Sequence, residues 1–289
     1  MQVLDRQLSA LANQVDRIYL IDNGSPDVSA RICELARSPE VEVVPLGENM
    51  GIGYAQNLGI RMASACQATH VLLMDQDSLP APDMVEKLLA AEGALLAKGC
   101  RIAALGPSYQ DHRQNRISPF MRIRGLRFDY CVCSGDTLFV EVEHLIASGT
   151  MIPLSVIDHV GAMREDFFID YIDIEWSLRA KRHGYTSYGV CHARMEHTLG
   201  ETPMDILGKK IPMHSPVRQY YQVRNAVRLY LDPKIPSTWK LVVGWRMLVK
   251  YALFSLFADL RLQRWAMMAK GVWHGATNRL GPIDRPLSR

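Results

Sequence analysis

Two carboxylates separated by one residue, Asp75 and Asp77, follow the apolar run from Val71 to Met74. The run has the length and composition of a buried strand, so both acids are predicted at the point where that strand ends. Hard divalent cations prefer oxygen ligands and keep positions open for substrate oxygens, so the pair could present Mg²⁺ or Mn²⁺ to a diphosphate. A solvated loop in which Asp77 caps the next helix would use the same residues.

Two further polar segments follow predicted strands. Asp22 ends the strand predicted at 17–21, where its carboxylate could accept a hydrogen bond from a nucleobase, although an ordinary turn has the same composition. The segment 48–59, ENMGIGYAQNLG, places two glycines before a predicted helix, where a ligand can approach the backbone closely. A dinucleotide-binding loop needs its third glycine earlier than Gly59, which excludes that type of site.

The elements that must position these side chains alternate along the first two hundred residues. Short β-branched runs lie at 17–21, 41–44, 70–74 and 102–105. Helical patterns lie at 3–15, 25–37, 54–65, 82–97, 173–183 and 217–231, and less regular strand patterns at 130–133 and 137–142. This alternation predicts an α/β fold with a mostly parallel sheet flanked by helices. Such sheets bind ligands at the carboxyl ends of their strands.

Taken together, three of these segments resemble a known family. The segments DNGS (22–25), ENMGIGYAQNLG (48–59) and LLMDQD (72–77), in this order and spacing, resemble family 2 glycosyltransferases with a GT-A fold. The segments FFIDYIDIEWSLRAKRHGY (167–185) and RQYYQVRNAVRL (218–229) resemble the rhamnosyltransferase branch, and the tail ending GVWHGATNRLG is similar as well. The resemblance implies a GT-A-like catalytic domain at 1–231, followed by a basic helical extension at 232–289.

The resemblance implies roles on the donor side of the site. The residues concerned are Asp22, Asn49, Gly51, Asn57 and Asp75. Asp22 would contact the base, Asp75 would lie near the ribose and diphosphate, and the other three would line the nucleotide pocket. Arg218 and Arg224 could clamp phosphates of the donor or of a lipid-linked acceptor, although the basic edge of an amphipathic helix would look the same.

A metal ion is also implied. Asp77 would bind it, and His197, which stands in a His-x-x-Gly setting, would complete its coordination. A neutral imidazole suits Mn²⁺, so the implied cofactor is Mg²⁺ or Mn²⁺. A lone histidine is more often a satisfied structural residue, and the sequence alone does not separate these two interpretations.

The acceptor side of the site is implied by position. Ser148, Gly149 and Thr150 match the loop under the donor sugar and the acceptor, and Trp176 is placed beside them. Asp173 would be the catalytic base, because the family places an acid near the start of the helix that runs into the R-x-x-R-x-G-Y segment.

Two neighbouring acids, Asp170 and Glu175, compete with Asp173 for this role. All three could also interact favourably with the helix dipole, so spacing alone does not choose among them. One carboxylate is needed, since an inverting transfer requires a base for the acceptor hydroxyl, whereas a departing diphosphate requires no proton.

The implied activity is inverting transfer of L-rhamnose from dTDP-L-rhamnose to a polysaccharide or lipid-linked oligosaccharide. Relatives begin with an apolar strand that would precede Met1 here, so we expect that the chain starts further upstream or is a truncated, weakly active nucleotide-sugar-binding module. A sugar-phosphate nucleotidyltransferase would need a glycine-rich basic loop after its first strand, and the sequence has none.

Charge is distributed unevenly along the 289 residues, which contain 33 Lys and Arg and 30 Asp and Glu. Residues 234–289 contain ten basic and two acidic residues, which leaves 23 basic and 28 acidic residues in the rest. In a continuous tail helix Arg246, Lys250, Arg261 and Arg264 would share one side. This pattern predicts that the tail contacts anionic lipid at the inner face of the cytoplasmic membrane, and that the protein has no nucleic-acid partner. Packing of the tail on the catalytic domain would produce much of the same charge pattern.

The six cysteines show no paired spacing. We predict reduced, mostly buried thiols in a cytoplasmic protein.

Overall fold

A computed structural model describes residues 2–25, 40–111, 116–133, 135, 137–197, 203–206, 209–212, 214–257 and 260–283. The helix predicted at 25–37 lies almost wholly outside these residues. The chain forms two compact units. The first comprises residues 1–122, 130–165 and 173–198, and the second comprises 123–129, 166–172 and 199–289. The helix at 216–231 therefore groups with the C-terminal helices, whereas the sequence pattern grouped it with the catalytic domain.

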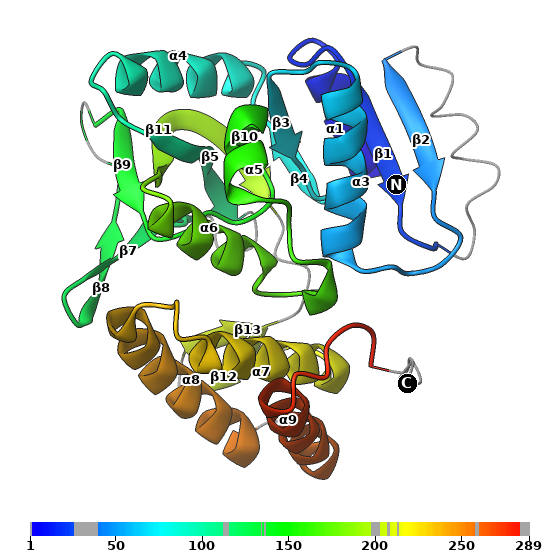
Figure 1. The fold of residues 1–289 in the computed structure, drawn as a ribbon, viewed down its shortest axis with the longest axis vertical. Helices are drawn as coiled ribbons and strands as arrows, with labels where there is room; N and C mark the ends of the chain where they lie inside the picture. The colour runs from blue at the N-terminus through cyan, green and yellow to red at the C-terminus, as the bar shows by residue number, and fades with distance from the viewer. Residues whose placement is uncertain are drawn as a thin grey trace. The chain divides into compact units, whose positions relative to one another are not determined.

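The first unit is built on a seven-stranded sheet (Figure 1). Its main path runs β3 (His70–Leu73), β10 (Thr150–Pro153), β5 (Ile102–Asp111), β11 (Thr186–His197) and β4 (Ser78–Pro80). β6 (Arg116–Ile117) pairs with β5, and β9 (Phe139–Val142) pairs with β11. A separate parallel pair joins β1 (Ile18–Asp22) to β2 (Val41–Pro45).

The α/β class predicted from the sequence is confirmed, but the sheet is more mixed than predicted. Within the seven-stranded sheet only β5 and β11 pair in parallel, and β10 is antiparallel to both β3 and β5. β10 comes from the irregular stretch after residue 107, where alternation along the chain does not report strand direction.

Helices cover this sheet because each has one apolar side. They are α1 (Gln2–Leu11), α3 (Ile52–Ala65), α4 (Met84–Leu96), α5 (Leu154–Val160) and α6 (Ile172–Arg182), with a 3₁₀ turn at Glu165–Phe167. In α4 the residues Met84, Leu88 and Leu95 recur at helical spacing and are fully buried against β5 and β11. This core fixes the strands whose ends carry the polar residues.

The second unit contains three long helices, α7 (Pro216–Leu231), α8 (Ser237–Phe257) and α9 (Arg261–Ala276), and the hairpin of β12 (Pro203–Ile206) and β13 (Lys209–Pro212). A further hairpin, β7 (Phe120–Arg124) with β8 (Arg127–Cys131), spans the division. α9 packs closely on α7 through Gly271 and Gly275, since a Cβ atom at Gly275 would lie 2.5 Å from the Arg224 carbonyl oxygen.

The tail is not the continuous helix that the charge pattern assumed. α8 ends at Phe257 and α9 begins at Arg261, and Arg264 is buried, where its guanidinium donates to the carbonyl of His214. The predicted single basic side is therefore wrong, because Arg264 faces the protein. Among the described residues, no helix has the length and apolar character needed to span a membrane.

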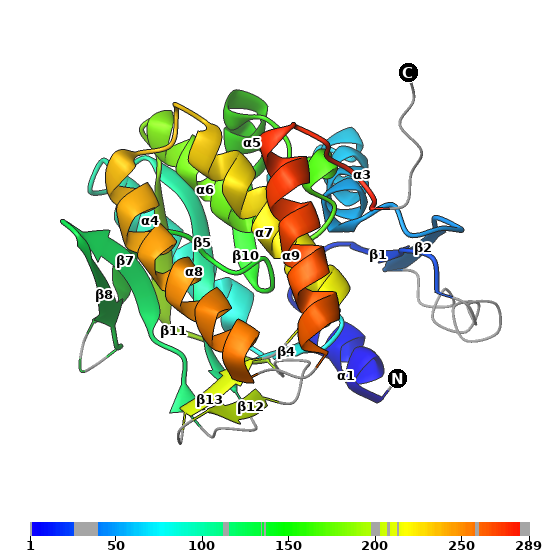
Figure 2. The same cartoon turned by 90° about the horizontal axis from the view of Figure 1, so that it is seen from below.

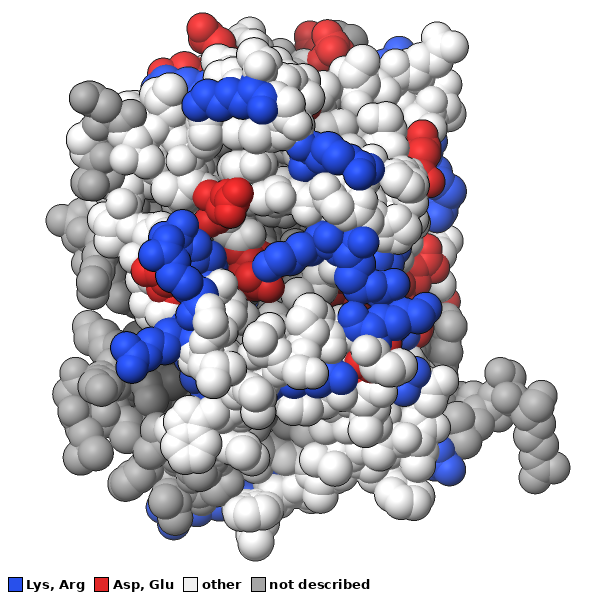
Figure 3. Space-filling view, turned by 60° about the vertical axis from the view of Figure 1, so that its left-hand side comes forward, with Lys and Arg blue, Asp and Glu red and all other residues white. Residues whose placement is uncertain are grey.

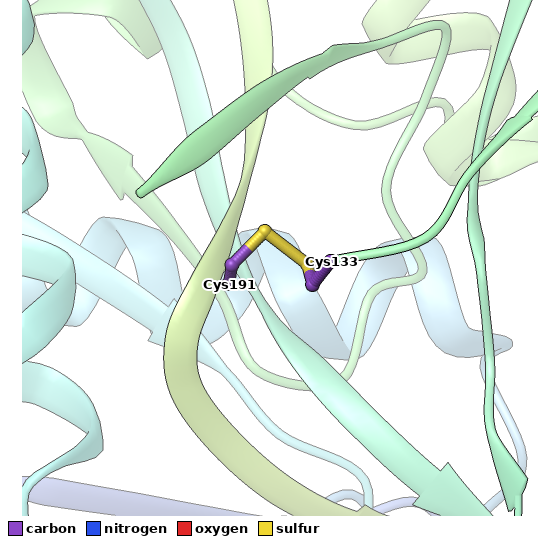
Figure 4. Close-up of a disulfide and its surroundings, with 2 residues drawn as sticks. All are labelled: Cys133 and Cys191. Carbon is purple, nitrogen blue, oxygen red and sulfur yellow. A yellow bond between two sulfur atoms is a disulfide. The ribbon is translucent and has the colours of Figure 1, made fainter. Parts of the chain in front are cut away.

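The cysteine prediction also needs correction. Cys133 and Cys191 form a disulfide that ties the segment before β9 to β11 (Figure 4). Of the other described cysteines, Cys66 is exposed and Cys100 and Cys131 are half-buried. Sequence spacing could not reveal the pair, because 58 positions separate its members.

Candidate active site

Three potential metal ligands meet at one end of the first unit's sheet. Asp75 and Asp77 follow β3, and His197 is the last residue of β11. Their ligand atoms all lie within 4.8 Å of one another, and Asp77 Oδ1 is 3.5 Å from His197 Nδ1. The structure thus brings together the two predicted metal ligands and adds Asp75, which the resemblance had assigned to the ribose and diphosphate.

The positions of these ligands follow from strand pairing. β4 and β11 are antiparallel with Ser78 directly opposite His197, and the Ser78 hydroxyl lies 2.7 Å from His197 Nδ1. The Ser148 hydroxyl donates to Ser78 Oγ at 2.6 Å and accepts from the Asp75 N–H at 3.1 Å. One chain of hydrogen bonds therefore links the acidic loop, the loop before β10 and the end of β11.

The sequence analysis missed two residues of this arrangement. Gln7 on α1 is 3% exposed and donates from Nε2 to the Asp75 carbonyl at 2.6 Å. Ser78, which is fully buried, was overlooked because it reads as an ordinary turn residue after the acids. Gln7 could have been found from the sequence, because it is a polar residue on the side of a helix that is predicted to be buried. The role of Ser78 could not, because it depends on how distant strands pair.

The chemistry of the cluster fits a divalent cation. Asp77 Oδ1 is buried and has no hydrogen-bond partner among the residues that the structure describes, and such an atom normally carries a substantial desolvation cost. Two carboxylates and an imidazole form a mixed oxygen and nitrogen set of the kind that Mn²⁺ accepts, and oxygen ligands suit Mg²⁺.

The loop from Ser148 to Thr150 is fixed to the end of β3. The Gly149 N–H donates to the Leu73 carbonyl at 2.7 Å, and Thr150 pairs with Leu73 in the sheet. Gly149 has φ +79°, and a Cβ atom there would lie 2.6 Å from Pro107 Cγ, so a larger residue would be both strained and crowded. The predicted sugar loop is therefore a rigid wall beside the acidic cluster.

Asp173 lies in the first turn of α6, where its Oδ1 accepts the Ile174 N–H at 2.9 Å. It lines a small cavity of about 20 Å³ together with Leu73, Thr150 and Trp176. Asp173 thus reaches the same β3–β10 junction as the Ser148 loop, although Asp77 does not line this cavity.

The two competing acids are each held by an arginine. Glu175 accepts from Arg179 at 3.0 and 2.9 Å, and Asp170 accepts from Arg218 at 3.1 and 3.2 Å. Each carboxylate thus has both oxygens engaged in a bidentate pair with a guanidinium.

Trp176 does not offer the contact that the resemblance implied. Its indole is 2% exposed, and the indole N–H donates to the Gly161 carbonyl at 2.9 Å. The side chain therefore supports the floor of the Asp173 cavity instead of presenting a polar group to an acceptor.

The predicted nucleotide segment lies at the ends of β1 and β2. The Asn49 side-chain oxygen accepts from Asn23 at 3.2 Å and from the Gly51 N–H at 3.0 Å, and Gly51 caps the start of α3. The Asp22 carboxylate accepts the Ser25 N–H at 3.3 Å and is half-buried. These partners shape a turn in which Asp22 keeps accepting capacity.

Asn57 is committed to the protein itself. It is 3% exposed, and its amide bonds with the N–H and carbonyl of Met163 and with Glu165 at 2.8 to 2.9 Å. Both of its donors are used in this way, so we remove Asn57 from the donor-binding residues.

Arg218 and Arg224 lie in the second unit. Arg218 forms the ion pair with Asp170 described above, and its side chain is 38% exposed. Arg224 is fully buried, and its guanidinium donates to the carbonyls of Asp166, Phe167 and Gly281. Burial lowers the pKa of Arg224. The predicted phosphate contact of Arg224 is therefore wrong in this structure, because main-chain oxygens occupy its donors.

The chain has a GT-A-like α/β fold, as its motifs predicted. The fold resembles solved structures that each match 96% of the chain. The crystal structure of GalNAc-T7 with UDP, GalNAc and Mn²⁺ has a TM-score of 0.59 at 14% identity, with 54% of that chain covered. S. aureus TarS residues 1–349 has a TM-score of 0.58 at 16% identity, with 78% covered. At these identities the likeness concerns the fold alone.

Sequence comparison then gives the family. Residues 2–146 match the model of glycosyl transferase family 2. The chain is 36% identical over 208 residues to dTDP-rhamnosyl transferase RfbF of Shigella flexneri. The aligned region covers 70% of this chain and 67% of that protein. The chain belongs to glycosyl transferase family 2 and is a glycosyltransferase, as its motifs predicted.

Proposed function

We propose that this enzyme transfers L-rhamnose from dTDP-L-rhamnose, with inversion, to a glycan or lipid-linked oligosaccharide at the inner face of the cytoplasmic membrane. The choice of donor is supported by the 36% identity to a dTDP-rhamnosyl transferase. The observation that carries the reaction type is the meeting of Asp75, Asp77 and His197 within 4.8 Å at the end of the sheet.

Asp77 and His197, joined by Asp75, would hold Mg²⁺ or Mn²⁺ at this cluster. The bound cation would offset the negative charge of the diphosphate. Ser78 and Ser148 keep His197 and the Asp75 main chain in place through their hydrogen bonds. Such outer partners orient ligands and tune their affinity.

Asp173 would act as the general base. Its carboxylate takes the proton of the acceptor hydroxyl while that oxygen forms a bond to the anomeric carbon of rhamnose. The diphosphate departs on the side of this carbon opposite to the attacking oxygen. The bond between the carbon and the diphosphate oxygen breaks, and its electron pair leaves with dTDP. The arginine pairs of Asp170 and Glu175 support this choice, because both oxygens of each of those carboxylates are already engaged with a guanidinium.

The remaining roles follow the geometry of the loops. Asp22, with Asn49 and Gly51, would receive the nucleobase at the ends of β1 and β2. The fixed loop of Ser148, Gly149 and Thr150 would support the sugar. Arg218 would approach phosphates only by exchanging its bond with Asp170.

A donor screen tests the proposal. Purified enzyme would be given dTDP-L-rhamnose, UDP-sugars and GDP-sugars with Mg²⁺ or Mn²⁺. Release of the corresponding nucleoside diphosphate (dTDP, UDP or GDP) would be measured for this enzyme and for Asp77→Ala and Asp173→Ala. We expect turnover of dTDP-L-rhamnose, loss of metal-dependent donor binding in Asp77→Ala, and retained binding without transfer in Asp173→Ala. Preference for another donor would overturn the rhamnose assignment, and near-normal transfer by either variant would overturn that residue's role.

A further inference from the structure

The two C-terminal helices carry an unusual amount of exposed apolar surface. Among the described side chains of these helices, seven large apolar ones are between 50% and 87% exposed: Leu241, Trp245 and Leu248 on α8, and Leu262, Trp265, Val272 and Trp273 on α9. Three of the five tryptophans in the sequence are among them. We call these seven residues the apolar surface of the second unit.

Helical spacing gathers these residues on the outer side of each helix. In α8, Leu241, Trp245 and Leu248 recur at intervals of four and three residues. In α9, the four apolar residues fall within an arc of about 100° when each residue turns the helix by about 100°. The other side of α9 packs on α7 through its buried positions Arg264, Met268, Gly271 and Gly275.

The two helices lie side by side next to α7 in both ribbon views (Figure 2). The space-filling view shows a broad uncharged area at the bottom, where these helices lie in Figure 1 (Figure 3). Exposed apolar area of this extent marks an interaction site more often than ordinary surface.

The charges on the same helices identify the kind of partner. α8 and α9 contain six basic residues and no acidic residue; the six are Lys240, Arg246, Lys250, Arg261, Arg264 and Lys270. A second copy of this surface would bring like charges together, which disfavours a symmetric dimer. A surface of anionic phospholipid headgroups would attract each exposed cation by about 1 kcal/mol.

We propose that α8 and α9 dock flat on an anionic lipid bilayer, with Trp245, Trp265 and Trp273 at the level of the headgroups. Indole rings favour that zone because their bodies are apolar and their N–H groups remain near water. Arg261 and Lys270 of α9 are exposed next to its apolar residues and would meet the phosphates. This docking is independent of the reaction catalysed by the first unit.

The test is binding of the whole protein to vesicles of phosphatidylglycerol and phosphatidylethanolamine, with phosphatidylcholine vesicles for comparison. We expect cosedimentation with the anionic vesicles and at least tenfold weaker binding to phosphatidylcholine. Replacing all three residues, as Trp245→Gln, Trp265→Gln and Trp273→Gln, should weaken binding at least tenfold. The matched control, Leu96→Gln with Leu126→Gln, removes apolar residues that are 57% and 65% exposed elsewhere and should bind normally.

Tryptophan fluorescence of the unaltered protein keeps the proposal testable if the triple variant does not fold. Brominated anionic lipid should quench the emission of the three exposed tryptophans, while Trp176 and Trp239, both 2% exposed, remain unquenched. Absence of quenching, equal binding to both kinds of vesicle, or normal binding by a folded triple variant would overturn the proposal. A dimer that forms without lipid and is lost in the triple variant would assign the surface to a second copy and overturn it too.

Discussion

Two polar clusters of this protein, both selected from sequence motifs, differ in how their hydrogen-bonding groups are satisfied. At the acidic cluster, Asp77 Oδ1 is buried and no described residue forms a hydrogen bond with it, and three ligand atoms lie within 4.8 Å of one another. At the second cluster, Arg224 and Asn225 are fully buried and donate to main-chain carbonyls. The first arrangement is organised to receive a ligand, whereas the donors of the second already form hydrogen bonds within the protein.

The second cluster has a structural task that explains its burial. Arg224 and Asn225 hold the segment 166–172, in which Phe168, Asp170 and Tyr171 have φ between +63° and +66°. Each such residue costs on the order of 1–3 kcal/mol, so the segment needs outside support. The segment ends at the first residue of α6, and Asp173 follows it directly. The arginine that we first considered a phosphate ligand instead maintains the backbone that leads into the proposed base.

The largest expected effect concerns the acidic cluster. Asp77→Asn should weaken Mn²⁺-dependent binding of dTDP-L-rhamnose by about 100-fold, because the amide is a poor ligand for the cation. Calorimetric titration with and without Mn²⁺ measures this loss. The control is Asp83→Asn, which alters an acid paired with Lys87 on the surface and should bind normally. Equal loss in both variants would mean that general charge, and not ligation, holds the donor.

The next effect concerns the buried arginine. Arg224→Met should lower the free energy of unfolding by about 3 kcal/mol or more, because three carbonyls each lose a hydrogen bond from the guanidinium. Urea denaturation followed by circular dichroism measures it. Arg228→Met, one turn later on α7 and only half-buried, should cost less than about 1 kcal/mol. If Arg224→Met kept full stability but lost donor binding, the phosphate role would be restored.

His144 tests whether a buried, unsatisfied atom by itself indicates a ligand site. Within the described part of the chain, its Nδ1 is enclosed without a hydrogen-bond partner, as Asp77 Oδ1 is, but it belongs to no ligand cluster there. Burial lowers its pKa to about 4, so the unfolded chain binds a proton between about pH 6.5 and 4 that the folded protein does not. Stability contributed by the neutral imidazole is therefore complete above that range and is lost as the pH falls through it.

His144→Gln should remove part of this acid sensitivity. Between pH 7 and pH 4.5, the free energy of unfolding of the variant should fall by on the order of 2 kcal/mol less than that of the unaltered protein. Urea midpoints of both proteins across this pH range measure it. Metal binding should be unchanged at pH 7, and a change there would place His144 with the acidic cluster after all.

The smallest expected effect concerns Ser78. Ser78→Ala removes the hydroxyl beside His197 Nδ1 and should weaken Mn²⁺ binding about tenfold, as loss of an outer partner does at metal sites. Ser78→Thr retains the hydroxyl and should restore much of the affinity. Unchanged binding in the alanine variant would mean that strand pairing alone orients His197.

The sequence predicted much of the first unit because its signals are local. The strands at 18–22, 41–45 and 70–73 and the helices at 52–65 and 172–182 follow from apolar periodicity. The insertion of β10 between β3 and β5 was not predictable, and neither was the pairing of Ser78 with His197. Register between distant segments is set by tertiary packing, which periodicity along one strand does not report.

The second unit was predicted less well, for a related reason. Arg224 stands in a motif whose charges suggested a ligand, and only its carbonyl partners show that it is internal. α8 ends at Phe257 and α9 begins at Arg261, whereas the charge pattern assumed one continuous helix. Charge and periodicity describe which side of a helix is apolar, but they do not reveal what covers it.

The disulfide between Cys133 and Cys191 closes a covalent ring that contains both Ser148 and Asp173. A protease that cuts once inside this ring, for instance trypsin at the exposed Arg182, cannot separate the pieces. The nicked protein would migrate as one species in a denaturing gel and as two after thiol treatment. Any fragment map of this enzyme therefore has to be recorded in both states.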